Sequence, residues 1–456
     1  MARDDDTDSD PPPSPWPSSL PPKIAAAILR RLPSHADRVR FAAVCRPWRA
    51  AAAHLPRRPP LPWLAVPDGT FFSFPSPTAL RFPSATAGYL GSCDDWLLFD
   101  GGAGAGEDGY RLANPFTGET ARLPPLSRVR FVVGDGGAPL GWRSIAADWR
   151  APFGAAVRKL AMGLGGRVAA AMVGDGRLGK IAMCKIAGAS SWVMSGHDTW
   201  RGITDMAFYD GKVYAVENTG DLLAMPTGVD ARSGEPTVAW ARCVVKASDH
   251  ASPATARRCS KQGPPPSTRH LLVHGGKLMM VHRTTTVTGT GGGATAKFAV
   301  FAADLAAARW SEVASVGDDT ALFVGRWRSL ARRVSPYGMP GNRIHFLDDD
   351  DRCSFSRGCR GKFGSYDMKD GKTYPLLPTL ELRNNGSGGT SATWLFPGDD
   401  QEVTQWCDLP YDVLGLVLGR VRSREDRARL SEVCRDWCAS ARQHLRTGTS
   451  RPSIVV

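Results

Sequence analysis

Apolar side chains near the start of the chain recur at the spacing of an α-helix. Ile24, Ile28 and Leu32 follow one another at steps of four residues, which places them on one face of a helix. The serines at 18–19 can cap that helix, and the prolines behind them fit its first turn, where a missing N–H group costs nothing. Pro33 is expected to end the helix, because the residue before a proline is pushed out of the helical region.

Two further short helices are expected in the same stretch. Ser34 and Asp37 form an S-x-x-D start for the second helix, an acidic variant of the capping box. Pro47 is expected to interrupt it, so that a third helix runs from Trp48 to Ala53. Three helices in about 40 residues cannot bury all of their apolar side chains. The stretch is therefore either a helical cap on the domain that follows or a docking module whose remaining face binds another protein.

Beyond a Pro-rich connector, the helical spacing gives way to short apolar runs separated by glycine, aspartate and asparagine. Paired runs around the turns YDGK, GDGR and HGGK are typical of β-hairpins. Such hairpins, with one aromatic residue near the end of each unit, predict a kelch-like β-propeller of six or seven blades over about residues 62–398. A pair of β-sandwiches is the alternative. The marker aromatic residues are Trp192, Trp240 and Trp310.

The helical pattern at the start of the chain is repeated near its end. Residues 406–445 match residues 16–55 without a gap, and Trp48, for example, corresponds to Trp437. The second copy lacks both helix-interrupting prolines, so its helices are expected to join differently. A glycine- and serine-rich stretch ahead of this copy indicates a flexible linker.

These patterns predict a multidomain, mainly β protein. The predicted segments are a disordered N-terminus at 1–15, a three-helix unit at 16–57, a propeller-like domain with a Pro-rich entry at 58–398, a second helical motif at 399–447 and a tail at 448–456.

The first helical unit resembles a known docking motif. Leu20-Pro21, an Ile/Leu helix, Leu32-Pro33, Asp37 and then Val44-Cys45-Arg46 with Trp48 are similar to an F-box, the motif by which substrate receptors join Skp–cullin–F-box ubiquitin ligases. The resemblance implies a core and an adaptor-binding surface built from one set of residues, which the sequence does not divide between the two roles. That set is Leu20, Pro21, Ile24, Ile28, Leu29, Leu32, Val44, Cys45 and Trp48.

The C-terminal copy resembles the same motif, and the sequence leaves its role open. An F-box normally precedes its receptor domain, so the resemblance implies an unusual placement. The copy is a second adaptor-binding head, a face that folds back or dimerises, or the remnant of a fused tandem copy. Its corresponding face is Leu409, Pro410, Val413, Val417, Leu418, Val433, Cys434 and Trp437.

The middle of the chain resembles the KIB-type β-propeller that follows an F-box in plant proteins. The stretches NPFTGETARLPPL, DMAFYDGKVYAV, FAADLAAARWSEV and GNRIHFLDDD occur in the order of that family. The resemblance extends over about residues 63–380. Because these stretches consist of turns and packing residues, the resemblance implies a fold and no chemistry.

Charge and composition narrow the classes of partner. The net charge of +13 comes mainly from arginines spread along the chain, whereas a nucleic-acid-binding protein concentrates them in a stripe or an arm. We therefore expect no nucleic-acid partner. Because no apolar run is long enough for a membrane helix and the acidic, Pro-rich start is unlike a secretion signal, we expect no membrane partner and a location in the nucleus or the cytoplasm. The ten cysteines are scattered, which fits free thiols in a reducing compartment.

Several patterns resemble chemical motifs and lack the context that each motif needs. Residues 104–109 match G-x-G-x-x-G, but Pro115 prevents the helix that a dinucleotide site requires. Gly371-Lys372-Thr373 follows no phosphate-loop glycine and indicates a hairpin turn. The remaining patterns, whose spacing does not fit a metal site, are His270, His274 and His282, the run Asp348 to Asp351, and the pair Cys353 and Cys359.

These observations favour a non-catalytic substrate-recognition subunit with no cofactor and no metal. Its helical unit is expected to bind a Skp-type adaptor, and through it a cullin, while the propeller binds a protein target. One alternative is an enzyme or small-molecule sensor, which would gather polar and titratable groups at one mouth of the propeller. Another is an interaction protein that never meets a cullin. The sequence does not identify the target, because propeller specificity lies in loops.

Overall fold

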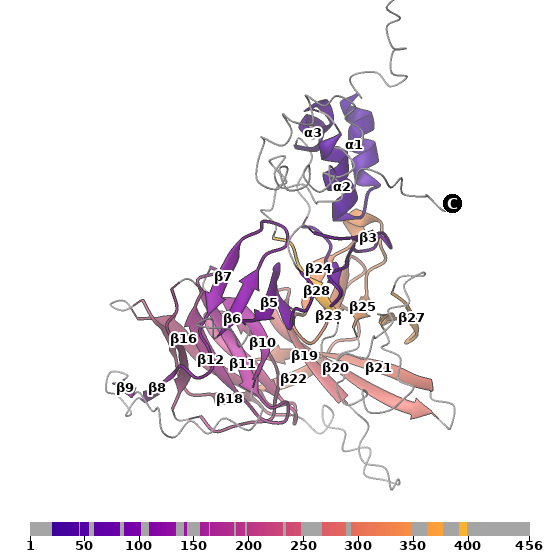
Figure 1. Ribbon diagram of the computed structural model, residues 1–456. Coiled ribbons are helices and arrows are strands. Elements are labelled where there is room, and N and C mark those ends of the chain that lie inside the picture. The colour runs from indigo at the N-terminus through magenta and orange to yellow at the C-terminus, as the bar shows by residue number, and fades with distance from the viewer. Residues whose placement is uncertain are drawn as a thin grey trace, which may run out of the picture.

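The protein consists of a small helical unit and a six-bladed β-propeller, with the helical unit at one end of the molecule (Figure 1). The computed structural model describes residues 21–44, 46–53, 59–82, 86–101, 109–133, 141–143, 156–163, 165–186, 188–196, 198–230, 234–247, 267–288, 293–347, 363–376 and 392–398. Within these ranges, no helix is both long and apolar enough to cross a membrane.

The helical unit contains α1 (Pro22–Arg30), α2 (His35–Ala43) and α3 (Arg46–Ala53). The cap of α1 is Pro21, which makes no side-chain hydrogen bond, so the prediction of a serine cap at 18–19 is wrong. A proline entry leaves fewer N–H groups to be capped. Ser34 caps α2 as predicted, because its Oγ accepts a hydrogen bond from the N–H of Asp37 at 3.4 Å. α3 begins at Arg46, two residues before the predicted start, because Pro47 fits the first turn of a helix.

The core of the helical unit is small. Ala25, Leu29 and Phe41 are buried together, and the ring of Phe41 lies 4.3 Å from that of Trp48 between centroids. A core of this size is marginal for independent folding, so the unit needs further support from its surroundings.

Six sheets form the blades of the propeller, and the strands of each blade follow one another from the innermost strand outward. Blade 1 comprises β28 (Thr393–Leu395), β1 (Trp63–Ala65), β2 (Phe71–Ser73) and β3 (Ala79–Leu80). Blade 2 comprises β4 (Gly91–Cys93), β5 (Trp96–Asp100), β6 (Tyr110–Ala113) and β7 (Thr120–Leu123). Blade 3 comprises β10 (Ala156–Gly163), β11 (Val168–Gly174), β12 (Gly179–Lys185), β13 (Trp192–Ser195), β8 (Val129–Val133) and β9 (Gly141–Arg143).

The second half of the ring has the same plan. Blade 4 comprises β14 (Ile203–Tyr209), β15 (Lys212–Glu217) and β16 (Leu222–Val229), with β17 (Pro236–Val238) and β18 (Arg242–Val245) both paired to β16. Blade 5 comprises β19 (Ser267–His274), β20 (Lys277–Thr288), β21 (Gly293–Asp304) and β22 (Arg309–Glu312). Blade 6 comprises β24 (Leu330–Arg333), β23 (Thr320–Val324), β25 (Arg343–Phe346), β26 (Gly364–Asp367) and β27 (Thr373–Pro375), with a 3₁₀ turn at Ser335–Tyr337.

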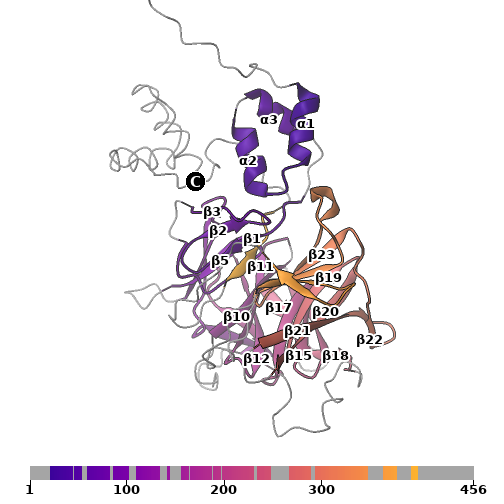
Figure 2. The ribbon, with the colours of Figure 1, turned by 90° about the vertical axis from the view of Figure 1, so that its right-hand side faces the viewer.

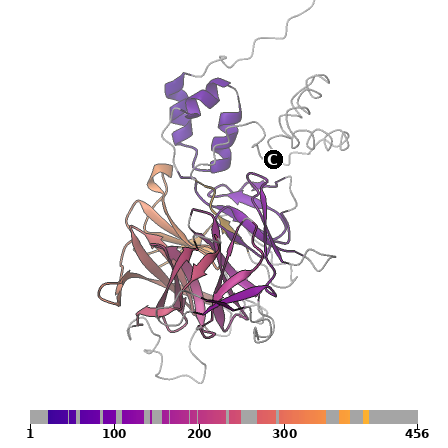
Figure 3. The same ribbon diagram turned by 90° about the vertical axis from the view of Figure 1, so that its left-hand side faces the viewer.

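The blades form a ring, which excludes the pair of β-sandwiches (Figure 3). Neighbouring innermost strands contact one another in turn: β28 with β4, β4 with β10, β10 with β14, β14 with β19, and β19 with β24. The predicted propeller is confirmed with six blades, the lower of the two expected numbers. Its kelch-like subtype stays a prediction.

The ring is closed by strands from the two ends of the propeller. On blade 1, Trp63 of β1 lies opposite Leu395 of β28 in an antiparallel pair. Ser92 of blade 2 then donates a hydrogen bond to the carbonyl of Trp394 at 2.9 Å. The last strand of the propeller therefore completes its first blade and joins it to the second.

The two faces of the ring differ in what they carry. β28 ends and β1 begins at one face, where the N–H of Phe396 donates to the carbonyl of Asp94 in the β4–β5 turn at 2.8 Å. The β14–β15 and β19–β20 turns lie at this face too, and the Tyr209 hydroxyl donates to the carbonyl of Gly276 between them at 2.6 Å. We call it the helical face, because the helical unit attaches here. The opposite, distal face carries the β15–β16 turn and the start of β19, since neighbouring strands run antiparallel.

Apolar clusters fill the space between neighbouring blades all around the ring. Three buried tryptophans also donate their ring N–H to a carbonyl of the preceding blade. Trp192 donates to Pro124 at 2.7 Å, Trp310 to Gly220 at 2.9 Å and Trp394 to Val324 at 3.2 Å. Two of the three predicted marker aromatics thus tie blades together. The third, Trp240, is 52% exposed and does not, whereas the role of Trp394 was not foreseen.

Candidate functional site

The helical unit packs directly on blade 1 through the start of α2. His35 Nδ1 accepts a hydrogen bond from Trp63 Nε1 at 3.3 Å, and the N–H of Ala36 donates to Ser73 Oγ at 3.1 Å. The Ala36 side chain is buried in the apolar cluster between blades 1 and 2. Burial and the charge of Arg38 lower the pKa of His35 to about 4, so the neutral imidazole is the acceptor at neutral pH.

A second contact joins α2 to blade 6. The Arg38 guanidinium lies 5.9 Å from the ring centroid of Tyr337, and the Tyr337 hydroxyl donates to the carbonyl of Pro59 at 2.5 Å. Side chains on two blades therefore hold the helical unit, in addition to the Pro-rich connector.

The end of the helical unit away from the propeller exposes two large apolar side chains. Ile24, in the first turn of α1, is 50% exposed, and Val44, at the end of α2, is 59% exposed. Figure 2 shows that α1 begins and α2 ends at this end. Exposed apolar side chains that lie together on one small unit are typical of a protein-docking surface.

The other residues predicted for adaptor binding divide between core and surface. Leu29 is buried inside the helical unit, so it has a core role in place of a surface role. Ile28, Leu32 and Trp48 are half-buried and pack against that core from its edge. Pro21 is exposed. Leu20, Cys45 and the second set, Leu409, Pro410, Val413, Val417, Leu418, Val433, Cys434 and Trp437, lie outside the described residues.

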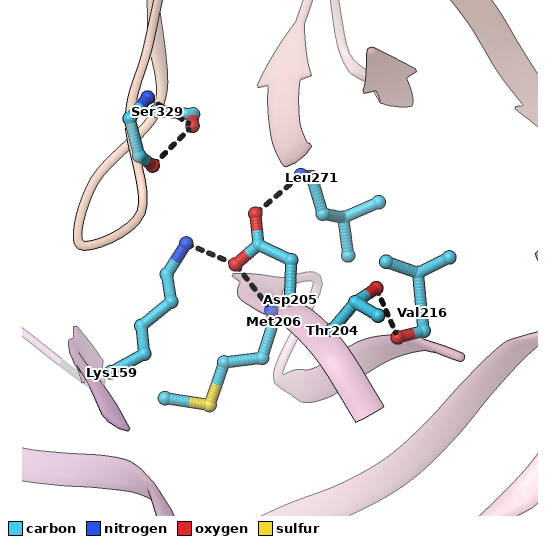
Figure 4. A network of polar contacts seen from close by, with 8 residues as sticks. Lys159, Thr204, Asp205, Met206, Val216, Leu271 and Ser329 are labelled. Carbon is cyan, nitrogen blue, oxygen red and sulfur yellow. Dashed lines mark hydrogen bonds and ion pairs between the residues drawn. The ribbon is translucent and has the colours of Figure 1, made fainter. Parts of the chain in front are cut away.

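A buried ion pair lies where the innermost strands of blades 3, 4 and 5 meet (Figure 4). Lys159 on β10 donates to the carboxylate of Asp205 on β14. That carboxylate also accepts hydrogen bonds from the N–H of Met206 at 2.7 Å and from the N–H of Leu271 on β19 at 2.7 Å. A β-bulge lies beside each charged residue and turns its side chain out of the alternating strand pattern.

This pair joins strands and is closed to substrate. Lys159 is 2% exposed and Asp205 is 1% exposed. Burial raises the pKa of Asp205, while the Lys159 charge and the two N–H donors act against the rise. A site for an enzyme or sensor needs groups that a ligand can touch, so we assign this pair a structural role.

Three histidines are buried as neutral side chains in blades 5 and 6. The pKa of His270 and that of His345 are lowered to about 3, and that of His282 to about 4, with burial as the main cause. His345 packs between Phe74 and Phe323, at centroid distances of 5.0 and 4.8 Å. In the described part of the chain, no group of His, Cys, Asp and Glu is arranged to hold a metal ion.

The remaining chemical patterns are turns or lie beyond the described residues. Gly371 has a φ of 68° in the turn between β26 and β27, which confirms the hairpin interpretation. Cys93 and Cys184 are buried free thiols, and Cys243 is an exposed one. Most of the G-x-G-x-x-G stretch (102–108), Asp348 to Asp351, Cys353 and Cys359 lie outside the described ranges.

Sequence reasoning missed the contacts that place these groups. Lys159 and Asp205 each stand inside an otherwise apolar strand, in VRKLAM and ITDMAF. A charge within a buried strand predicts a partner, and this signal was available. The docking of His35 and Ala36 on blade 1 left no such signal, because it depends on how two separate units meet.

Three family models match segments of the chain. The model described as KIB1-4 beta-propeller matches residues 64–402, the one described as F-box-like matches residues 17–58, and the one described as F-box domain matches residues 406–447. No curated protein matches the chain.

Two solved structures are similar to the chain at low sequence identity. The N-terminal domain of Nup159 is 7% identical with a TM-score of 0.27, and the match covers 73% of this chain and 83% of that one. The tricorn protease is 10% identical with a TM-score of 0.24, and the match covers 70% of this chain and 31% of that one.

Proposed function

This chain belongs to the KIB1-4 β-propeller family and has an F-box segment on each side of its propeller, and on that premise we propose that it is the substrate-recognition subunit of a Skp–cullin–F-box ubiquitin ligase. The helical unit, its first F-box, binds a Skp-type adaptor, which links it to a cullin. The propeller binds a protein target. The protein catalyses no reaction and raises the concentration of its target near a ubiquitin-loaded enzyme.

The exposed apolar end of the F-box carries this proposal. Ile24 and Val44 are both at least half exposed at that end, and half-buried Trp48 and Ile28 extend the apolar area. Burial of each large aliphatic side chain by an adaptor is worth about 1.5–3 kcal/mol. The apolar end also points away from the propeller, so a bound adaptor leaves the propeller free for a target (Figure 2).

The test replaces the exposed apolar pair in both F-boxes of the full chain. The variant carries Ile24→Asp and Val44→Asp together with Val413→Asp and Val433→Asp at the matching positions of the second copy. Because a charge in an apolar contact costs about 2 kcal/mol or more at a central position, we expect binding to a purified Skp-type adaptor to weaken at least about 100-fold. Binding is measured by biolayer interferometry.

A matched control separates this effect from a general effect of added charge. Leu178 on blade 3 is also a large exposed apolar residue, at 43% exposure, and Leu178→Asp is expected to bind the adaptor as the wild type does. Unchanged adaptor binding by the four-residue variant would sink the proposal. If the wild type binds the adaptor but brings down no cullin from cells, it is an interaction protein acting outside the ligase.

The target is identified in cells by affinity purification and mass spectrometry after proteasome inhibition. We expect the adaptor, a cullin and at least one accumulating partner to be recovered together. The partner should be lost when the propeller is disrupted and retained by the variant that cannot bind the adaptor.

A further inference from the structure

The buried charges of the propeller do not balance. In the described part of the chain, four charged side chains are buried: Lys159, Asp205, Arg269 and Arg283. Lys159 is paired with Asp205, and Arg283 donates a hydrogen bond to the carbonyl of Leu347 at 3.2 Å. Arg269 is 4% exposed, its Nε has no hydrogen-bond partner, and no ion pair among these residues includes it. One buried positive charge is therefore left without a counterpart.

Arg269 lies at the distal face, between blades 4 and 5. It is the third residue of β19, which begins at that face, and it stands directly opposite His282 of β20. Leu271, two residues along the same strand, packs in the cluster between blades 4 and 5, so Arg269 also faces blade 4. Figure 1 shows β20 and β21 extending from the part of the propeller opposite the helical unit.

The neighbours of Arg269 leave its head group accessible to a small anion. Gly220, in the β15–β16 turn, approaches with backbone alone, and a Cβ at this position would lie 3.7 Å from Arg269 Nε. His282 provides a second donor, because its Nε2 also has no hydrogen-bond partner. Two nitrogen donors from adjacent strands thus lie side by side under a glycine turn.

A buried guanidinium without a partner lowers stability unless a counter-charge neutralises it. Its planar fork of N–H groups fits the two oxygens of a phosphate or a carboxylate, which makes a bidentate anion the best partner.

We propose that the propeller binds an anionic group, a phosphate or a carboxylate, at its distal face between blades 4 and 5, through Arg269 with His282 as second donor. The group belongs either to a side chain of a bound protein or to a free small anion, and the chemistry at Arg269 is the same. This site is separate from the F-box, so the proposal holds or fails independently of adaptor binding.

The test measures thermal unfolding of the full chain in phosphate and in chloride at equal ionic strength. We expect inorganic phosphate at ten times its Kd to raise the Tm by about 3 °C or more. Arg269→Met removes the unpaired charge and keeps the apolar stem. It is therefore expected to unfold at a higher temperature than the wild type in chloride and to lose the phosphate shift.

The control is Arg309→Met, which removes an exposed arginine from the same blade and should keep the full phosphate shift. An equal shift in all three proteins would indicate an adventitious ion only. No shift in the wild type would also overturn the proposal, and so would an Arg269→Met chain that is less stable than the wild type or does not fold. A structural arginine produces that loss, whereas an uncompensated one does not.

The source of the anion is distinguished by O-phospho-L-serine with L-serine as the control. A shift with phosphoserine at lower concentration than with inorganic phosphate assigns the group to a phosphorylated side chain of a bound protein. A shift with inorganic phosphate alone assigns it to a free anion.

Discussion

Single buried residues stabilise the propeller at the points where its strands meet, and the Lys159–Asp205 pair joins three of the innermost strands. Lys159→Met leaves the Asp205 carboxylate buried without its cation. We expect the free energy of unfolding to fall by about 3–5 kcal/mol. Urea unfolding followed by tryptophan fluorescence measures the change. Adding Asp205→Asn removes the second charge and should restore part of the loss. A single variant as stable as the wild type would show that the pair contributes little.

The three buried histidines predict how stability depends on pH. His270, His282 and His345 have a pKa of about 3 to 4 in the folded protein, against about 6.5 when unfolded. Below pH 6.5 the unfolded chain therefore binds more protons, so their contribution is full above pH 6.5 and is lost as the pH falls toward 4. The slope from three groups is at most about 4 kcal/mol per pH unit.

The His345→Phe variant isolates one of these protons. Its ring fits the aromatic pocket of Phe74 and Phe323, and both nitrogens of His345 are without hydrogen-bond partners. We expect the variant to lose about one third of the histidine contribution to the slope between pH 6.5 and 4. Urea midpoints at a series of pH values provide the measurement. A slope equal to that of the wild type would contradict the prediction.

At the scale of elements, the tryptophan N–H groups tie each of three blades to the blade before it. Trp394→Ala removes a buried ring from β28 and should cost about 3–5 kcal/mol of unfolding free energy. Trp394→Phe keeps most of the packing and leaves the Val324 carbonyl unpaired, so a cost of about 1–3 kcal/mol is expected. Trp240→Ala is the control, because Trp240 is largely exposed and should change stability by about 0.5 kcal/mol or less.

The sequence identified elements where local chemistry determines them. Ser34 caps α2 because the bond is made within one turn, and the hairpin at Gly371 forms because glycine accepts a positive φ. The cap of α1 was misassigned, because consecutive prolines also start a helix without a side-chain cap. Trp240 was misassigned for another reason: a tryptophan near the end of a hairpin looks the same in sequence whether its ring is buried or exposed.

The candidate sites follow the same division. The F-box surface could be listed from one contiguous pattern, but only the fold separates buried Leu29 from exposed Ile24 and Val44. Arg269 and His282 could not be paired in advance, because their contact depends on the register of β19 and β20. Groups that converge from different strands leave no spacing in the sequence to read.

At the scale of the whole molecule, the contact of α2 with blades 1 and 6 fixes the F-box relative to the propeller. Ala36→Arg places a long charged side chain in a buried position of this contact and should release the helical unit. We expect a larger radius of gyration by small-angle X-ray scattering, with adaptor affinity unchanged within about twofold. Ubiquitination of a recruited target should fall, because adaptor and target no longer keep one orientation.

The control for this change is Ala53→Arg, at an exposed position at the end of α3. It adds the same side chain to the same unit and should leave the scattering profile as it is. If Ala36→Arg also leaves the profile unchanged, the contact does not fix the F-box, and the Pro-rich connector alone sets its position.

The place of β28 at the end of the propeller also determines the order in which the protein can assemble during synthesis. The F-box helices are complete once residue 53 has emerged, whereas blade 1 waits for Thr393–Leu395. At a translation rate of about 5–20 residues per second, the inner edge of β1 stays unpaired for roughly 20–60 s. An unpaired strand edge recruits other strands. A nascent chain could thus meet its adaptor before its receptor ring exists, and chaperones would have to protect that edge in the interval.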